Sequence, residues 1–450
     1  MPYIQNSDAD REAMLAEVGV DSVRALFDSL PQDQLLDRDL AIDPGLNEDQ
    51  LQRHLAKLGA ENLPAAGACF LGGGFYDHAW PALVDHLMQR SEFLTAYTPY
   101  QPECSQGTLQ WIFEFQTMIA ELCGCDVANA SMYDGASAAA EAALMAMNST
   151  RRSKVVVSAG MHPDTRATIE TYLKHIDAEV VTAPLVDGVT AWRDLVDDQT
   201  AAVMVQQPNY LGNIESMAPV VELAKSVKAQ SVASVYPVAL GLLNSPGEHG
   251  FDIVVGDGQS LGVPLGYGGP SFGFFASTQK SVRKLPGRLV GISEDTEGKR
   301  AYTLTFQTRE QHIRREKATS NICTNNALIA LRGCMHMAAL GPQGLEEVAC
   351  VSRQRALEMV SILESAGFER AFPNAAFFNE VAFRAPSEEH MLSFKTALRN
   401  QGLYGVLPMG KDYPNMADVF TMACTERTLE EDLVRLGKIA ASVLQQEVAR

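Results

Sequence analysis

Short apolar runs alternate with amphipathic stretches through the middle of the chain. The apolar runs are rich in β-branched residues and predict strands at 154–159, 179–185, 201–206, 231–239, 251–257 and 272–276. Apolar residues at helical spacing predict helices at 106–124, 135–148, 162–176 and 216–229. Strands that alternate with helices predict an α/β fold with a mostly parallel sheet covered on both faces.

The two ends of the chain have a different texture. Residues 1–65 predict a helical arm, with a start resembling a capping box at Asn47 and Gln50. This arm has little apolar surface of its own, so we expect it to pack on the main body or on a partner. After about residue 340, helices and strands predict a smaller α/β unit. We therefore predict three parts, an arm at 1–65, a large domain at 66–335 and a small C-terminal domain at 336–450.

Composition narrows the class of protein. The 450 residues are 46% hydrophobic and carry a formal net charge of −19, which argues against nucleic acid and anionic membrane as main partners. The first residues lack the basic and apolar regions of a secretory signal, and no apolar run could span a membrane, so we expect a cytoplasmic protein. Of the eight cysteines, Cys123 and Cys125 are the only close pair, which predicts reduced thiols and no metal site.

A glycine-rich loop follows the strand expected at 251–257. Five glycines and two prolines lie between positions 258 and 271, a density typical of a tight structured loop. Its layout is like the loop that carries the cofactor lysine in pyridoxal-phosphate enzymes, but Gln259 stands where the lysine is expected. A Schiff base requires a primary amine, which glutamine cannot supply. The nearest lysines are Lys280 and Lys284, and Lys280 remains an alternative anchor.

Three further strand ends or helix starts could belong to a cofactor pocket. Gly135 and Ser137 open a helix whose free N–H groups suit an anion, but Asp134 at the expected N-cap would accept those N–H groups and repel a phosphate. Both a capped helix and a retained anion site stay open here. Asn209 lies in a turn after a strand, which favours a structural role over a binding one. Tyr236 follows the strand end at which pyridoxal-phosphate enzymes place an acid for the ring nitrogen.

Two stretches are unusual for surface loops. The first, at 96–110, combines tyrosines and prolines with an acid, and its candidate residues are Tyr97, Thr98, Tyr100 and Glu103. The second, at 303–328, is basic and then polar, with candidates Arg309, His312, Arg314, Arg315, Lys317, Asn321, Thr324, Asn325 and Asn326. A basic cluster in an acidic chain predicts an acidic partner or an anionic substrate. A salt-bridged helix followed by an asparagine-rich cap is the alternative.

Three long motifs resemble one family. The stretches "YTPYQPECSQGTLQ", "GDGQSLGVPLGYGGPSFGFFA" and "REQHIRREKATSNICTN" are similar to the glycine cleavage system P-protein, or glycine decarboxylase. The resemblance covers nearly the whole chain and is strongest to the first, or alpha, subunit of P-proteins that are split into two chains. It implies the fold-type-I pyridoxal-phosphate transferase fold.

The resemblance also implies how the work is divided. The second, or beta, subunit would hold pyridoxal phosphate on its lysine. In this chain Gln259 would occupy the position of that lysine, Tyr236 the position of the acid that bonds the ring nitrogen, and Asp134 a position in the phosphate cup. Two alpha and two beta subunits would decarboxylate glycine and pass the aminomethyl group to the lipoyl arm of the H-protein. This chain would complete the active site through the two unusual stretches. The alternatives are a stand-alone enzyme that uses Lys280 and a scaffold that only stabilises the second subunit.

Overall fold

The computed structural model describes residues 5–62, 67–192, 194–307, 310–318, 320–322 and 324–445. Its backbone forms two compact units, 1–63 and 64–450, which are considered separately. The N-terminal unit contains helices α1 (Asp8–Val18) and α2 (Glu48–Gly59). The capping box expected at Asn47 is confirmed, because the Gln50 N–H donates to the Asn47 side chain at 2.9 Å. Neither helix buries a residue within the unit, and Leu51, Leu55 and Leu58 of α2 are exposed.

A seven-stranded sheet forms the centre of the second unit, in the order β1-β9-β8-β7-β6-β2-β3. Its strands are β1 (Val127–Ala128), β2 (Lys154–Ser158), β3 (Glu179–Ala183), β6 (Thr200–Gln207), β7 (Gln230–Val235), β8 (Ile253–Asp257) and β9 (Gly273–Ser277). Pairing is parallel from β3 through β8, whereas β9 runs antiparallel to β8 and β1 antiparallel to β9. The mostly parallel sheet expected from the sequence is confirmed.

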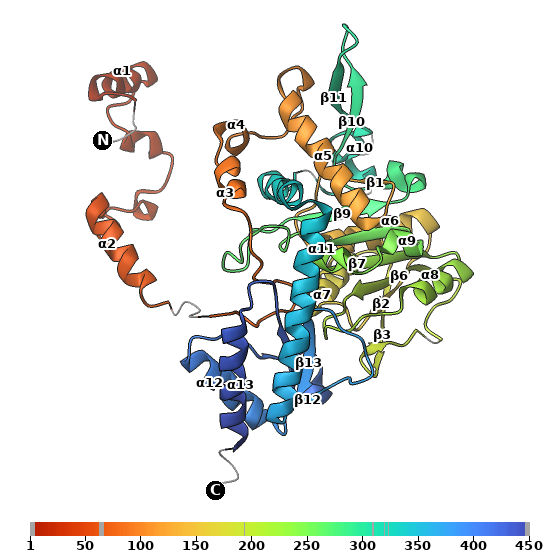
Figure 1. The fold of residues 1–450 in the computed structure, drawn as a ribbon. Helices are drawn as coiled ribbons and strands as arrows, with labels where there is room; N and C mark the ends of the chain where they lie inside the picture. The colour runs from red at the N-terminus through yellow and green to blue at the C-terminus, as the bar shows by residue number, and fades with distance from the viewer. Residues whose placement is uncertain are drawn as a thin grey trace. The chain divides into compact units, whose positions relative to one another are not determined.

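Helices cover both faces of this sheet (Figure 1). The side chains of β6 show the division, because Ala202 and Met204 belong to a core with α6 and α7, and Val203 and Val205 to a core with α5 and α8. The helices are α5 (Gln106–Cys123), α6 (Gly135–Thr150), α7 (Pro163–Leu173), α8 (Met217–Ser226) and the short α9 (Pro246–His249). Since successive residues of a strand point to opposite faces, a continuous apolar run fills both cores.

Smaller elements surround the large sheet. Two short strands, β4 (Leu185–Val186) and β5 (Val189–Thr190), pair with each other, and β10 (Leu289–Glu294) forms a hairpin with β11 (Arg300–Thr305). Helices α3 (Ala82–Met88) and α4 (Ser91–Leu94) precede α5, and α10 (Gln311–Arg314) follows the hairpin.

Helix α11 (Ala327–Ala366) connects the large sheet to a second one, contacting both α5 and α13. The helix bends at Gly341, which has a non-helical φ of 65° and is followed in sequence by Pro342. The second sheet is antiparallel in the order β12-β13-β15-β14. Its elements are β12 (Glu369–Arg370), β13 (Glu380–Arg384), α12 (Glu388–Asn400), β14 (Leu407–Pro408), β15 (Val419–Ala423) and α13 (Glu430–Gln445). The boundary expected at 335/336 falls inside α11, and the three domain limits stay a prediction.

The segment that begins at residue 67 links the two sheets. Phe70 is buried in the core of the second sheet, where its N–H donates to the Tyr404 carbonyl and its carbonyl accepts from Ala423. A few residues later the same segment reaches the glycine-rich loop after β8. Residues far apart in sequence therefore meet at the carboxyl ends of the parallel strands.

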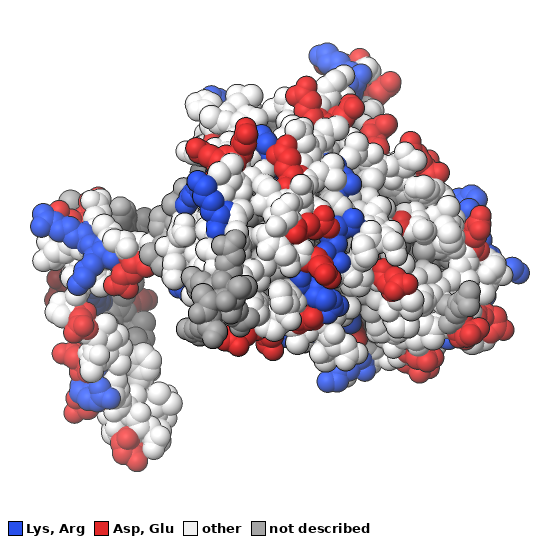
Figure 2. Space-filling model, turned by 60° about the horizontal axis from the view of Figure 1, so that its bottom comes forward, with Lys and Arg blue, Asp and Glu red and all other residues white. Residues whose placement is uncertain are grey.

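Charge on this unit is mixed. On the face drawn in Figure 2, acidic and basic side chains are interspersed, with neither sign forming one continuous patch. Among the described residues, no helix is both long enough and apolar enough to cross a membrane.

Candidate functional site

The glycine-rich loop after β8 is held tightly against β9. The Gly258 N–H donates to the Phe272 carbonyl at 2.7 Å, and a Cβ at Gly258 would lie within 2.1 Å of the Phe272 ring. Only glycine fits at this position, because the aromatic ring occupies the space of a side chain. The close packing directs Gln259 into the interior, where it is 2% exposed.

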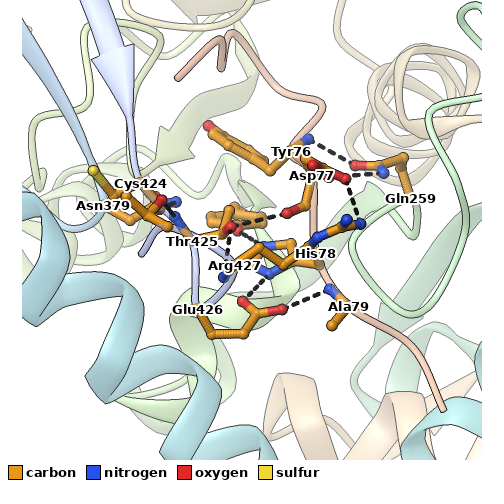
Figure 3. Close-up of polar contacts among 12 residues, drawn as sticks. Tyr76, Asp77, His78, Ala79, Gln259, Asn379, Cys424, Thr425, Glu426 and Arg427 are labelled. Atoms are coloured by element: carbon orange, nitrogen blue, oxygen red, sulfur yellow. Dashed lines mark hydrogen bonds and ion pairs between the residues drawn. The ribbon is translucent and has the colours of Figure 1, made fainter. Parts of the chain in front are cut away.

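The Gln259 amide is fully engaged with the segment that crosses from the second sheet (Figure 3). Its Oε1 accepts from the Tyr76 N–H at 2.9 Å, and its Nε2 donates to the Tyr76 carbonyl at 3.0 Å and to the Val263 carbonyl at 2.9 Å. One side chain thus satisfies both backbone polar groups of Tyr76, a buried residue. A lysine could donate to the carbonyls but could not accept the N–H.

Tyr76 stacks on Tyr236 at the end of β7. Their ring centroids are 4.3 Å apart with an interplanar angle of 29°. The Tyr76 hydroxyl donates to Glu380 at 2.7 Å, and the Tyr236 hydroxyl contacts His78, whose other ring nitrogen lies 2.7 Å from Glu426. Burial raises the pKa of both phenols well above the usual range and also raises the pKa of Glu380. Both rings are therefore neutral, anchored packing groups.

Two carboxylates occupy the start of helix α6. Asp134 is its N-cap and accepts the Ser137 N–H at 2.7 Å, which confirms the capped helix, one of the two alternatives that the sequence left open. Asp257, at the end of β8, accepts the Gly135 N–H at 3.1 Å, the Gln259 N–H at 2.9 Å and the Ser271 hydroxyl. Burial raises the pKa of Asp257 to about 6, against the effect of these hydrogen bonds. Two of the N–H groups that could cradle a phosphate, those of Gly135 and Ser137, are already bonded to acids of this chain.

The two stacked tyrosines and the two carboxylates line a pocket of about 430 Å³, which we name the Tyr76 pocket. Its wall includes Gly74, Tyr76, Asp134, Gly135, Tyr236 and Asp257. Pyridoxal phosphate does not fit the residues present, because the amine is missing, the helix start is acidic and the Tyr236 ring is covered by Tyr76. The pocket keeps the position of a cofactor site in an α/β sheet without its chemistry.

A second cavity, of about 350 Å³, lies beside it and shares Pro270 and Asn326 with the Tyr76 pocket. We name it the Arg288 cavity; its wall includes Tyr97, Thr98, Arg288, Leu304, Thr324 and Asn325. Tyr97 is 79% exposed, whereas Arg288 is 8% exposed. The cavity therefore combines a buried cation with an aromatic side chain that nothing in the described chain covers.

Arg288 joins the two unusual sequence stretches. Its terminal nitrogen donates to the Tyr100 hydroxyl at 2.6 Å, and the guanidinium carbon lies 5.1 Å from the centre of the Tyr100 ring. Its Nε lies 3.9 Å from the carboxylate of Glu310, which is itself 3.5 Å from His312 Nδ1. Tyr100 and His312 approach edge to face at 6.5 Å. Stretches expected from sequence to act together thus meet through an arginine.

Comparison with known proteins gives a match over nearly the whole chain. The family model described as "Glycine cleavage system P-protein" matches residues 1–439. The chain belongs to this family. A relative from Geotalea uraniireducens (strain Rf4), named "Probable glycine dehydrogenase (decarboxylating) subunit 1", is 44% identical over 97% of this chain and 99% of its own length. A relative of the same name from Bacillus subtilis (strain 168) is 46% identical over 95% of this chain and 96% of its own.

Solved structures agree with the P-protein family assignment. A crystal structure of glycine decarboxylase (P-protein) of the glycine cleavage system, in inhibitor-bound form, superposes with a TM-score of 0.89 at 45% identity, covering 98% of this chain and all of the other. Sphingosine-1-phosphate lyase of Burkholderia pseudomallei K96243 gives 0.65 at 15% identity over 92% and 94% of the two chains. The second likeness shows the fold alone, and together the structures confirm the expected fold class.

Within this P-protein fold, the sequence candidates separate into groups. Asp134, Gly135 and Tyr236 line the Tyr76 pocket, and Tyr97, Thr98 and Thr324 line the Arg288 cavity. Tyr100 and His312 do not line the cavity, but Tyr100 is hydrogen-bonded to Arg288 of its wall, and His312 lies 3.5 Å from Glu310. Asn325 lines the Arg288 cavity, and Asn326 lines both pockets. The remaining candidates line neither pocket: Glu103, Ser137, Asn209, Gln259, Arg314, Arg315, Lys317 and Asn321. Arg309 lies outside the described residues.

Two of the remaining candidates have defined surroundings. Asn209 is buried in its turn, where its Oδ1 accepts the N–H groups of Leu211 and Asn213 at 3.1 Å, as a structural role requires. Lys280, the alternative anchor, is exposed on the short helix Gln279–Lys284 and lines neither pocket.

Sequence reasoning did not single out Tyr76, Asp257 or Arg288. Asp257 lay inside the motif "GDGQ" and could have been noticed as an acid two residues before the expected lysine. Arg288 follows Gly287, whose φ of 72° turns the chain into β10. Tyr76 gave no local signal, because its role arises from a contact with a residue 183 positions away.

Proposed function

We propose that this chain is the first subunit of a two-chain glycine decarboxylase, an oxidoreductase of the glycine cleavage system. Relatives named as subunit 1 match this chain over nearly their whole length. Because a first subunit implies a second, these names support a second subunit as the partner of this chain. One observation supports placing the cofactor lysine on the second subunit. At the expected lysine position this chain has Gln259, whose buried amide is hydrogen-bonded to both the N–H and the carbonyl of Tyr76. The amine for the cofactor must then come from the other subunit.

The cofactor of the assembly is pyridoxal phosphate, which supplies the electron sink for loss of CO₂ from glycine. We place it on the second subunit, which bears the lysine. The contribution of this chain is a wall that binds and orients glycine and excludes water. Tyr97, Thr98 and Thr324, together with the apolar groups of the Arg288 cavity, support this role. Exclusion of water strengthens polar contacts inside the closed site and favours loss of a carboxylate.

The basic stretch after β11 is proposed as a second contribution. Arg314 lies at the end of α10, and Arg315 begins the short helix Arg315–Lys317. Both side chains are exposed. Exposed cations suit an acidic partner, and the lipoylated H-protein is that partner in our proposal. The assembly would contain two subunits of each kind and work in the cytoplasm.

The proposal is tested by titration. The purified chain is added to a fixed concentration of the lysine-bearing subunit, and exchange of labelled CO₂ into the carboxyl group of glycine is measured. We expect exchange to rise with added chain and to saturate at one chain per partner. Arg314→Ala should weaken the apparent affinity for H-protein while leaving exchange in the presence of saturating H-protein near wild type.

Two outcomes would overturn the proposal. Full exchange by the lysine-bearing subunit alone at high concentration would make this chain a stabilising scaffold. Absorbance of a bound cofactor in the isolated chain, fixed by borohydride, would make it a stand-alone enzyme. The exposed position of Lys280 argues against the second outcome.

A further inference from the structure

We infer that Arg288 and Tyr100 form the element that binds the carboxylate of glycine, with Tyr100 as the donor and Arg288 as its positioning residue. This inference rests on the proposed function and names a subsite within it. Neither the family match nor the names of the relatives assign a role to Arg288.

The direction of the Arg288–Tyr100 hydrogen bond carries the first step. A guanidinium has five N–H donors and no acceptor, so at 2.6 Å the Tyr100 oxygen must be the acceptor. The hydrogen of the Tyr100 hydroxyl is then free to be donated elsewhere. Tyr100 is 49% exposed, so this hydrogen can reach a ligand outside the described chain.

The charges around the pair carry the second step. Arg288 is 8% exposed, and its Nε is buried without a hydrogen-bond partner among the described residues. Its counter-ion Glu310 lies 3.9 Å away, beyond hydrogen-bond distance, and also faces His312. Because an Arg288 nitrogen lies 2.6 Å from the Tyr100 oxygen, whereas Glu310 is an ion-pair partner at 3.9 Å from Nε, the guanidinium creates a positive potential at that oxygen. The potential polarises the O–H bond and favours an anionic acceptor.

Geometry and chemistry together select a small carboxylate. Arg288 lines the cavity together with Tyr97, Thr98 and the apolar side chain of Leu304, and Tyr100 is joined to this wall through its hydrogen bond with Arg288. A tyrosine hydroxyl placed between guanidinium and ligand holds the carboxylate without a direct ion pair. That matters for decarboxylation, because a direct ion pair would stabilise the ground-state carboxylate that must be lost.

The test compares two amines in the assembled enzyme. Glycine carries the amine and the carboxylate, whereas methylamine carries the amine alone. Binding of each is followed by the absorbance change of the cofactor on the partner subunit, which is independent of turnover. Tyr100→Phe should weaken glycine binding about tenfold and leave methylamine binding within about twofold.

Arg288→Lys keeps the charge but loses the planar fork, and we expect a similar selective loss. Because Arg288 acts through Tyr100, the double variant should lose no more affinity for glycine than Tyr100→Phe alone. Arg283→Lys is the matched control, since Arg283 lies 5.3 Å from the Phe306 ring and does not line the cavity. It should bind both amines as the wild type does.

Equal weakening of glycine and methylamine, or additive losses in the double variant, would overturn the inference. Arg288→Lys could disturb a buried site, so its thermal unfolding is measured as well; Tyr100→Phe, on a half-exposed ring, remains decisive by itself. Failure of the inference is distinct from failure of the proposed function. In the first case the wild-type chain supports glycine–CO₂ exchange and the variants keep the wild-type preference for glycine; in the second, even the wild-type chain is dispensable.

Discussion

The Tyr76 pocket and the Arg288 cavity are neighbours of similar volume, about 430 and 350 Å³, yet they differ in how their polar groups are satisfied. In the first, the polar groups of Tyr76 find partners inside the chain, since its N–H donates to the Gln259 amide and its hydroxyl donates to Glu380. In the second, Arg288 retains a buried N–H without a partner among the described residues, and Tyr97 is 79% exposed.

The difference separates two uses of one fold. A pocket whose polar groups satisfy one another contributes to stability and has little to offer a ligand, because binding would have to replace bonds already made. A cavity with an unsatisfied donor and exposed aromatic side chains gains when something covers it. We therefore expect mutations in the Tyr76 pocket to change stability and mutations in the Arg288 cavity to change binding.

The largest effect on stability is expected from Tyr76→Ala. The change removes a buried ring stacked on Tyr236 and a hydrogen bond to buried Glu380, so the free energy of unfolding should fall by about 3–5 kcal/mol. Tyr97→Ala in the other cavity removes the same group from an exposed place and should cost less than about 0.5 kcal/mol. Urea unfolding of both variants measures the two changes in the free energy of unfolding. Equal losses of stability would contradict the expected difference between the Tyr76 pocket and the Arg288 cavity.

A change in pH should act through Asp257. Its pKa in the folded chain is about 6, above the ordinary value of 3.8, so between these values the folded state binds more protons than the unfolded one. The contribution of Asp257 to stability therefore falls as pH rises through this window, by at most about 3 kcal/mol. In Asp257→Asn the side chain cannot ionise, so the free energy of unfolding of this variant should fall less between about pH 4 and 7 than that of the wild type. Parallel profiles from urea unfolding would show that Asp257 titrates normally.

A lysine restored at position 259 should not restore a cofactor site. In Gln259→Lys the Tyr76 N–H loses its acceptor, which we expect to cost about 2 kcal/mol in the free energy of unfolding. The acids Asp134 and Asp257 still oppose a phosphate. Incubation with pyridoxal phosphate and borohydride should leave the variant unlabelled at this position, as judged by mass spectrometry. Stoichiometric labelling of the introduced lysine would mean that the pocket differs from a cofactor site by one residue only.

Much of the fold follows from local patterns. The run at 201–206 is apolar without alternation, which is what a central parallel strand buried on both faces requires, and β6 occupies this position. The capping pattern at Asn47 likewise depends on residues three positions apart. Such signals are legible because the interacting groups are close in sequence.

The candidate site could be predicted from the sequence only in part. Asp134 could be assigned as an N-cap because a cap is local, and the absence of an amine at Gln259 could be read from the loop motif. The partner of Gln259 could not be predicted, because the Tyr76 backbone belongs to the segment that leaves the second sheet and is far from Gln259 in sequence. Arg288 was hidden for the same reason, since its partners Tyr100 and Glu310 come from opposite sides of it in sequence.

Only a small effect on stability is expected from Tyr100→Phe, the variant that should matter most for glycine. Its hydroxyl makes one hydrogen bond to Arg288 on a half-exposed ring, so its loss should lower the free energy of unfolding by about 1 kcal/mol. Tyr97→Phe is the control, and it should change stability by less than about 0.5 kcal/mol. Thermal and urea unfolding of the isolated chain measure both. A loss near that of Tyr76→Ala would place Tyr100 among the packing groups and remove the distinction between the two cavities. A small loss, combined with selective weakening of glycine binding, would show that the Arg288–Tyr100 pair is built for a ligand.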